Sequence, residues 1–462
     1  MTSANEYQAA IENSLVGAVR VAGRVPESFS MVDRMQRYGV PGVAVAVVED
    51  GELHWASGYG VRAQGRSPVV PGTLFQAASI SKVVNAVGVL ALVESGALDL
   101  DVDVNSYLKR WRVPDNEFSA EAPVTLRRLL SHTAGTTTPG FPGYAPGATL
   151  PTLAEVLGGR APCNTTAVLI DTKPGTNFRY SGGGTTIVQM LVEDVTGRAY
   201  ADVMRDVVLA PLGMSASSFQ QPLGDLDAAG AACGHDISGQ MLADGVNVYP
   251  ELAAAGLWTT VLDLVRFVTS MQRTLGGLET PIISREMADL MITAIAPGPH
   301  GLGPEIASDG ATKRFRHNGT NVGFCSQFEA FVSGGRAAVV MTNGDGGNTL
   351  LGEILNSVAT AYEWPEFVPP AIVAAEVPAL VLEQYAGRYS GPFDRPLRLV
   401  HEGVELFSPS PYGRRQLIPL TTTRFLDAET GAEIAFETEA GQVTRAVVYV
   451  GGIELMTYER LP

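Results

Sequence analysis

Basic residues are scarce in this chain, and lysine is the scarcest of them. The 462 residues include 32 lysines and arginines against 48 aspartates and glutamates, a formal net charge of −16. Only four of the cations are lysines. The sequence has no basic cluster that could neutralise a phosphate backbone, so its composition argues against nucleic acid as a partner and favours a soluble globular protein.

Long apolar runs, cysteines and histidines are also few. No apolar run reaches the roughly 18 residues of a membrane-spanning helix. Glu6 and Glu12 precede any basic residue, and no apolar segment follows, so we expect neither a membrane partner nor a signal peptide. Cys163, Cys233 and Cys325 are odd in number and widely spaced, which is typical of reduced thiols in a cytoplasm. None of the six histidines has metal-ligand spacing to another ligand type. The sequence predicts no metal and no cofactor.

Strand-like segments lie on both sides of a long helical region. Val43–Val48 and Leu53–Gly58 predict a hairpin that turns at Asp50-Gly51, and Arg336–Thr342 predicts a further strand. The continuous apolar character of Val43–Val48 indicates a strand covered on both faces. Ser28–Arg37 is expected to be a helix. This order of elements predicts an α+β domain over residues 1–366.

The pattern changes after Trp364. A segment rich in Pro, Ala and Val, residues 367–380, is predicted to be a linker. Residues 381–462 contain short alternating segments, beginning with Arg395–Phe407, and turns such as Ala440-Gly441. They predict a small all-β barrel or sandwich without catalytic residues.

A Ser-x-x-Lys motif, Ser79 to Lys82, lies where an extended stretch meets an apolar helix expected to begin at Ser79 and end at Gly96. Residues three apart on a helix share a face, and a helix N-terminus favours negative charge. The pattern therefore gives a serine nucleophile a base. The motif alone is weak, because Ser106 to Lys109 also fits it; we interpret that copy as an exposed helix end.

Tyr180 precedes a glycine-rich turn and a predicted helix, Thr186–Val195. A phenol is a poor base at neutral pH unless a nearby ammonium lowers its pKa, and Lys82 could be that ammonium. The alternative is a tyrosine that only packs in the turn. The presence of Ser79 and Lys82 favours the catalytic interpretation.

His317-Asn318-Gly319-Thr320 precedes a predicted strand, Val322–Phe331. A glycine here suggests close approach of a ligand or another backbone. If the strand lies at an edge, the Thr320 N–H can act with that of Ser79 as an oxyanion donor. His317 is predicted to bond the substrate or the Ser–Lys–Tyr group. The alternative is a surface histidine at a strand start.

Ser79-x-x-Lys82, Tyr180-Ser181-Gly182 and His317-Asn318-Gly319, in this order, resemble the serine β-lactamase and penicillin-binding-protein hydrolases. The nearest branch holds class C β-lactamases, D-aminopeptidases, DD-carboxypeptidases and esterases. Segments around Ser131-His132 and Gly256–Thr260 are also similar to this branch. The resemblance implies an antiparallel sheet flanked by helices, with Ser79 as nucleophile and Lys82 and Tyr180 as proton carriers. The tail is similar to the lipocalin-like domain that some members append.

Two departures from the family pattern favour an esterase. The Tyr-x-Asn of the family is Tyr180-Ser181-Gly182 here, and the Lys-Thr-Gly of β-lactamases is His317-Asn318-Gly319. The second change removes a permanent cation suited to a substrate carboxylate. We therefore expect hydrolysis of a small ester or amide, a small-molecule substrate, by a protein that could form a homo-oligomer.

Three other interpretations remain open. The same acyl-enzyme could transfer its acyl group to an amine or alcohol, or serve a D-amino-acid-specific peptidase or amidase. A non-catalytic binding or sensor protein could retain the fold. A Ser131–His132 dyad is disfavoured because adjacent residues rarely face each other, and no Gly-x-Ser-x-Gly elbow is present.

Overall fold

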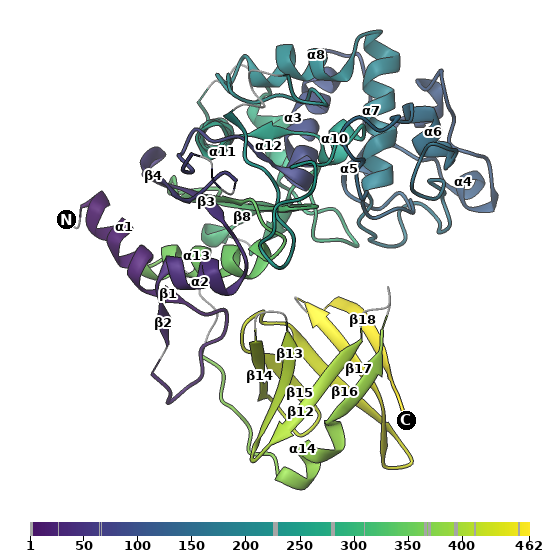
Figure 1. The fold of residues 1–462 in the computed structure, drawn as a ribbon. Coiled ribbons are helices and arrows are strands. Elements are labelled where there is room, and N and C mark those ends of the chain that lie inside the picture. The colour runs from purple at the N-terminus through teal and green to yellow at the C-terminus, as the bar shows by residue number, and fades with distance from the viewer. Residues whose placement is uncertain are drawn as a thin grey trace. The chain divides into compact units, whose positions relative to one another are not determined.

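The computed structural model describes residues 3–25, 27–63, 65, 67–224, 230–278, 282–308, 310–364, 367, 371–391, 396–410, 413–450 and 453–462. The chain forms two compact units (Figure 1). One comprises Gly39–Leu351, and the other comprises Met1–Tyr38 together with Gly352–Pro462. The predicted α+β class is confirmed, and so is the all-β C-terminal part.

A six-stranded antiparallel sheet forms the base of the Gly39–Leu351 unit, in the order β4-β3-β10-β9-β8-β7. Its strands are β3 (Gly42–Glu49), β4 (Glu52–Gly60), β7 (Glu305–Ala307), β8 (Arg314–Asn321), β9 (Phe324–Phe331) and β10 (Ala337–Thr342). The predicted hairpin is present: Asp50 and Gly51 both have positive φ, as a tight turn between twisted strands requires. Every residue of β3 except Glu49 is buried, so both faces of this strand are covered as predicted.

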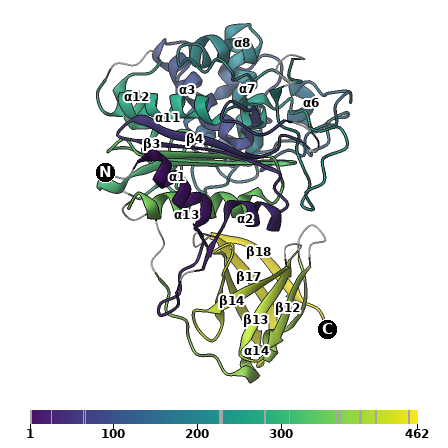
Figure 2. The same cartoon turned by 60° about the vertical axis from the view of Figure 1, so that its left-hand side comes forward.

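The helical region lies between β4 and β7 in the chain. Figure 2 shows the sheet nearly edge-on with α3, α7 and α8 on one side. The described helices of this region are η1 (Ala78–Ile80), α3 (Ser81–Glu94), η2 (Val104–Ser106), α4 (Glu117–Glu121), α5 (Leu126–Leu130), α6 (Leu153–Gly158), α7 (Gly182–Thr196), α8 (Tyr200–Met204), η3 (Arg205–Leu209), α10 (Leu252–Ala255), α11 (Val261–Leu275) and α12 (Arg285–Met291); the short η4 (Gly310–Thr312) follows β7. A two-stranded sheet, β5 (Phe75–Gln76) with β6 (Trp258–Thr259), joins the segment before Ser79 to the segment before α11.

One continuous apolar core holds the sheet and the helices of this unit together. The first ten residues of α3 are all buried, as expected for a central helix that is apolar on every side. α11 instead has one apolar face, which contacts β3 and β10. Helix α3, and with it the motif of Ser79, is therefore fixed by packing in all directions.

The other unit contains a closed eight-stranded barrel, β11–β18. Its strands are β11 (Gly387–Ser390), β12 (Leu397–Glu402), β13 (Glu405–Ser410), β14 (Gly413–Pro419), β15 (Arg424–Asp427), β16 (Glu433–Glu439), β17 (Gln442–Val450) and β18 (Ile453–Arg460). Closure pairs every strand and leaves no free edge, and an aromatic cluster around Tyr385 and Phe436 fills the interior. α14 (Ala379–Tyr385) precedes the barrel.

The remaining elements of this unit are α1 (Ala4–Asn13), β1 (Leu15–Val16), β2 (Ser28–Phe29), α2 (Met31–Arg37) and α13 (Gly347–Ala361), which begins in the other unit. The expectation of a helix over Ser28–Arg37 is wrong at its start. Ser28 and Phe29 pair with β1, and the Ser30 hydroxyl caps a helix that begins at Met31. Within Arg395–Phe407, a turn at Gly403 joins β12 to β13; Arg395 itself, and residues 368–370 of the expected linker, lie outside the described residues.

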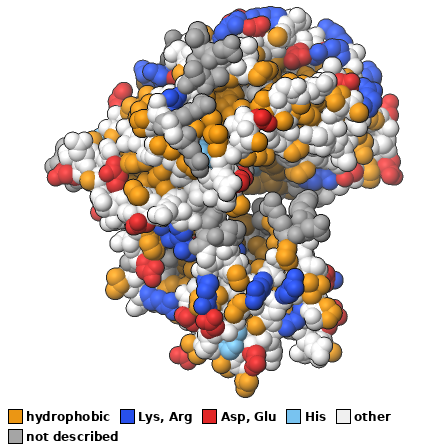
Figure 3. Space-filling model, in the orientation of Figure 1, with side chains coloured by type: hydrophobic (Ala, Val, Ile, Leu, Met, Phe, Trp, Pro, Cys, Tyr) orange, Lys and Arg blue, Asp and Glu red, His pale blue; other side chains and the backbone are white. Residues whose placement is uncertain are grey.

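Acidic and basic side chains alternate over the face shown in Figure 3, so the negative charge is not gathered in one patch there. Within the described residues, no helix has the length and apolar character needed to cross a membrane. All three cysteines are free thiols.

Candidate active site

Ser79 lies in η1, a single 3-10 turn that leads directly into α3. The expected helix therefore begins at Ser81 rather than at Ser79. Ala78, immediately before the serine, has a φ of +49°. This left-handed conformation costs a residue with a Cβ about 1–2 kcal/mol, so the surrounding packing must hold it. The strained turn places the half-buried Ser79 side chain beside the first turn of α3.

Lys82 lies one turn further and is 4% exposed. Its Nζ is 2.9 Å from Ser79 Oγ and 2.7 Å from the carbonyl oxygen of Ala254. Burial lowers the pKa of Lys82 to about 7, and burial is the only cause of the shift. A large fraction of such an amine is uncharged at neutral pH, so it can accept the proton of the serine hydroxyl.

The short helix α10 supplies the carbonyl of Ala254. The side-chain amide of Gln189, in α7, makes two hydrogen bonds that position α10. Its Oε1 accepts from Ala253 N–H at 3.0 Å, and its Nε2 donates to Pro250 O at 3.1 Å. Glu251, at the start of α10, is fully buried, and burial raises its pKa to about 7. Sequence reasoning missed Ala254, because a carbonyl ligand leaves no signal in the side-chain pattern.

Tyr180 precedes α7, whose first turn is capped by the hydroxyl of Ser181. The Tyr180 hydroxyl hydrogen-bonds the Ser79 side chain. Lys82 Nζ lies 5.0 Å from the centre of the tyrosine ring. The expectation that the Lys82 ammonium lowers the pKa of Tyr180 is wrong: desolvation by burial is the largest effect and raises this pKa above its ordinary value, although the hydrogen bond with Ser79 acts in the opposite direction. At neutral pH Tyr180 is therefore a neutral phenol and a proton donor.

The missing amide at Gly182 has a steric explanation. A Cβ at this position would lie 3.0 Å from the Phe141 ring and 3.2 Å from Pro139 O. A side chain here would require the Phe141 ring and the Pro139 carbonyl to shift by a few tenths of an ångström. The second hydrogen bond of Lys82 goes instead to the backbone of Ala254.

The His317–Thr320 segment is part of a strand, β8, and does not precede one. The predicted strand Val322–Phe331 is broken by a turn at Val322-Gly323, after which β9 begins. β7 pairs only with Arg314–Arg316, so among the described residues the rest of β8 is bonded on one side only, by β9.

This free edge of β8 lies against the nucleophile. A Cβ on Gly319 would come within 2.2 Å of Ala77 O and 2.9 Å of Ser79 N, so only glycine permits the approach. Asn321 and Phe324 close the two-residue turn, and such a closing pair is hydrogen-bonded. Because hydrogen-bonded pairs alternate along an antiparallel ladder, the N–H of Thr320 points away from β9 toward the free edge.

The ring of His317 is buried and neutral. Its Nδ1 lies 2.6 Å from the carbonyl oxygen of Asn318, which can only accept, so Nδ1 carries the proton. Nε2 then carries a lone pair and can only accept a hydrogen bond, and it has no partner among the described residues. Burial, with repulsion from His300 and Lys82, holds the pKa of His317 well below its usual range.

Two further histidines, His132 and His300, lie around Tyr180 and were not identified as site residues from the sequence. The His132 ring lies 4.4 Å from the Tyr180 ring, and the His300 ring lies 5.0 Å from that of His132. Ser181 N–H donates to His132 Nδ1 at 3.2 Å. Burial lowers the pKa of both histidines, so these rings are also uncharged at neutral pH. His132 and His300 come together only through tertiary contacts, so no local pattern marks them.

In the two rival motifs, Ser131 and Lys109 have structural partners. Ser131 Oγ bonds Arg127 O and the Thr133 hydroxyl, both at 2.9 Å, which is the pattern of a turn rather than of a dyad with His132. Near the second Ser-x-x-Lys copy, Lys109 Nζ donates to Asp194 O at 2.6 Å.

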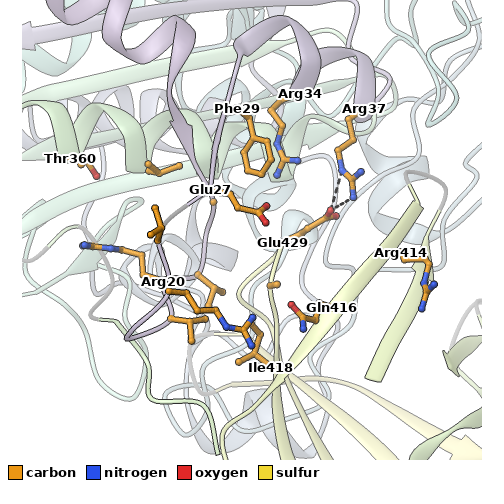
Figure 4. A pocket seen from close by; sticks show the side chains of 17 residues that line it. Arg20, Glu27, Phe29, Arg34, Arg37, Thr360, Arg414, Gln416, Ile418 and Glu429 are labelled. Atoms are coloured by element: carbon orange, nitrogen blue, oxygen red, sulfur yellow. Dashed lines mark hydrogen bonds and ion pairs between the residues drawn. The ribbon is translucent and has the colours of Figure 1, made fainter. Parts of the chain in front are cut away.

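An arginine-lined cavity lies elsewhere, in the unit that contains the barrel. It measures about 400 Å³, and its lining includes Arg20, Arg34 and Arg37 (Figure 4). Arg37 pairs with Glu429 across it. None of the predicted site residues lines this cavity.

Comparisons with known proteins identify the same part of the chain. A protein-family model described as Beta-lactamase matches residues 30–359. Penicillin-binding protein 4 of Amycolatopsis lactamdurans is 28% identical over 362 residues, which cover 72% of this chain and 89% of that protein. The human mitochondrial serine beta-lactamase-like protein LACTB is 39% identical over 99 residues, 21% of this chain and 18% of that protein.

Two solved structures share the fold. The octameric penicillin-binding protein homologue from Pyrococcus abyssi has a TM-score of 0.64 at 21% identity and covers 93% of this chain and 97% of its own. The D-amino acid amidase from Ochrobactrum anthropi SV3, complexed with L-phenylalanine amide, has a TM-score of 0.58 at 22% identity and covers 77% and 99%.

Proposed function

Since the chain belongs to the Beta-lactamase family of serine hydrolases, we propose that it cleaves a small ester or amide through an acyl-enzyme on Ser79. The observation that carries the proposal is the 2.9 Å contact between Lys82 Nζ and Ser79 Oγ. A lysine whose pKa is lowered to about 7 is a competent general base for its neighbouring hydroxyl.

In this mechanism Lys82 takes the hydroxyl proton while Ser79 Oγ attacks the substrate carbonyl carbon. The negative charge that develops on the carbonyl oxygen is stabilised by the N–H groups of Ser79 and Thr320. The tetrahedral intermediate collapses, and Tyr180, a neutral phenol bonded to Ser79, passes a proton to the departing alkoxide or amine. The proton that Lys82 took from Ser79 then passes to the Tyr180 phenolate, which restores the neutral lysine and the neutral phenol. Water attacks the acyl group by the reverse route, which regenerates the serine hydroxyl.

The esterase character is supported by what replaces two family residues. Where β-lactamases have the lysine of Lys-Thr-Gly, this chain has His317, a neutral histidine whose Nε2 lone pair has no partner in the part of the chain that the structure describes. A lone pair recognises a hydroxyl, amine or amide N–H, and offers nothing to the carboxylate of a penicillin. Gly182 stands where the family motif has asparagine, so this chain lacks an amide side chain that could contact a substrate amide.

Amide substrates and acyl transfer are the nearest alternatives. A D-amino acid amidase shares the fold, and a substrate amine is a donor that His317 Nε2 could accept. An acyltransferase would use the same acyl-enzyme with a different acceptor. A binding or sensor protein would need no working nucleophile.

The test is intact mass spectrometry after brief exposure to a fluorophosphonate, for the wild type and for Ser79→Ala. Both proteins are also assayed on a p-nitrophenyl ester, a D-amino acid amide and a chromogenic cephalosporin. We expect one adduct on the wild type, none on the variant, and ester turnover that exceeds lactam turnover. Absence of an adduct on the wild type would support a binding protein. Rapid cephalosporin turnover would contradict the esterase assignment and leave Ser79 as the nucleophile.

A further inference from the structure

A cavity that contains none of the predicted catalytic residues lies beside β6, in the same unit as Ser79. Its volume is about 400 Å³, within the range of small-molecule sites. The wall is mainly apolar and includes Leu223, Met241, Val246, Val248 and Trp258. Among the described residues of the lining, Asp244 alone is charged. An apolar wall with one anionic residue suits a neutral, apolar group and disfavours an anion.

Trp258 gives this wall an unused hydrogen-bond donor. The residue is 2% exposed, and its indole Nε1 has no partner among the described residues. The ring packs edge-on against Phe324. A buried donor without a partner destabilises the folded protein unless a ligand or water supplies an acceptor. An acceptor carried by an occupant of the cavity could satisfy this N–H.

The cavity wall is bonded directly to the segment that carries the nucleophile. Trp258 pairs with Gln76 in the β5–β6 ladder, and Ala77 N–H donates to Leu257 O at 2.8 Å. The side chain of Gln76 donates to Asn247 O, between two lining residues, at 2.7 Å. Gln76 lies three positions before Ser79, and three residues of extended chain span at most about 10 Å. This is comparable to the length of an octanoyl chain.

We propose that this cavity binds the apolar acyl chain of the substrate, a medium-length alkyl or aryl group, with the indole N–H of Trp258 available to an oxygen carried by that chain. The inference rests on the proposed esterase function and names the class of acyl group that the enzyme prefers. Each methylene moved from water into an apolar wall stabilises the bound state, so the preference should grow with chain length.

The first experiment fills the cavity. Rates on p-nitrophenyl acetate, butyrate and octanoate are compared for the wild type, Val246→Trp and a matched control, Val102→Trp, at a partly exposed valine that does not line the cavity. In Val246→Trp we expect kcat/KM to fall about tenfold or more on octanoate and to stay within about twofold on acetate. Val102→Trp should match the wild type on all three esters. Equal changes on acetate and octanoate, or no change, in a variant with wild-type circular dichroism would overturn the proposal.

A binding measurement keeps the proposal testable if Val246→Trp does not fold, and it needs no catalysis. Methyl octanoate is titrated into Ser79→Ala while tryptophan fluorescence is followed. We expect a saturable change that is absent from Ser79→Ala/Trp258→Phe and that methyl acetate does not produce. No change with methyl octanoate would overturn the acyl-chain site even if the wild type forms its Ser79 adduct. Absence of the adduct together with saturable binding would instead overturn the hydrolase function and retain the cavity as a binding site.

Discussion

Lys82 occupies an environment that disfavours its charged form. The ammonium group is desolvated, its protein partners are a hydroxyl and a carbonyl, and three neutral imidazoles stand around it. A lysine whose pKa falls from 10.5 to about 7 on folding destabilises the protonated native state by a few kcal/mol. This penalty is full below pH 7 and fades between pH 7 and 10.5, where the unfolded chain binds the extra proton and stability rises with pH.

The same pKa predicts the pH dependence of activity. If neutral Lys82 is the base, kcat/KM on a p-nitrophenyl ester should fall about tenfold per unit below pH 7 and approach a plateau in the mildly alkaline range. His132, His300 and His317 have pKa values lowered by burial, so the histidines stay neutral over this range. The rate of Ser79 labelling by a fluorophosphonate should follow the same curve. A flat profile from pH 6 to 9 would contradict the assignment of Lys82.

Sequence and structure agree best where chemistry depends on side chains at fixed local spacing. Ser79 and Lys82 are three residues apart on one helical turn, so their contact could be predicted from the sequence. Ala254 could not, because any residue has a carbonyl and only the fold selects this one. His132 and His300 were missed for a related reason: their rings meet at 5.0 Å although 168 positions separate them.

The edge of β8 adds a backbone N–H donor, that of Thr320, beside the serine and its base. The strand is paired with β9 along its whole length and with β7 only at its start, which leaves its second half open toward η1. Gly319 lets the two backbones approach. The sequence indicated the close approach through this glycine. It did not show that His317–Thr320 lies on a strand separate from β9, because the turn at Val322-Gly323 lies within an otherwise continuous strand-like pattern.

Replacement of one backbone N–H tests this arrangement. Thr320→Pro removes the N–H that points to the free edge without removing a ladder bond, so the strand should persist. We expect kcat to fall about 10²–10³-fold, the usual effect of losing one oxyanion donor, with little change in circular dichroism. Thr320→Val is the control, because it keeps the N–H and removes only the hydroxyl that contacts Asn348. Equal activity in the proline variant and the valine control would exclude this N–H as an oxyanion donor.

At the scale of the whole molecule, the predicted site residues are confined to one of the two compact units. All predicted site residues lie in Gly39–Leu351, whereas the barrel belongs to the unit that also contains Met1–Tyr38. Within that unit, Arg34 of α2 bonds the buried Glu353 of α13, and Arg37 bonds Glu429 in the turn between β15 and β16. The alternating pattern after residue 381 predicted the barrel. The grouping of the first 38 residues with it depends on such long-range contacts and has no sequence signal.

Deletion of the residues after Leu380 tests whether the barrel is needed for chemistry or for substrate choice. We expect residues 1–380 to fold and to form the Ser79 fluorophosphonate adduct, because the core around α3 is contained in Gly39–Leu351. The deletion removes the partner of Arg37 but leaves the Arg34–Glu353 pair. The Arg37–Glu429 pair is partly exposed, and such an ion pair contributes at most about 1 kcal/mol. The melting temperature should therefore fall by only a few degrees, as it should in full-length Arg37→Ala. A barrel that selects substrates predicts a change in the ratio of rates on large and small esters after deletion. An unchanged ratio would exclude that role, and an unfolded 1–380 chain would show that the catalytic part depends on the barrel for its stability.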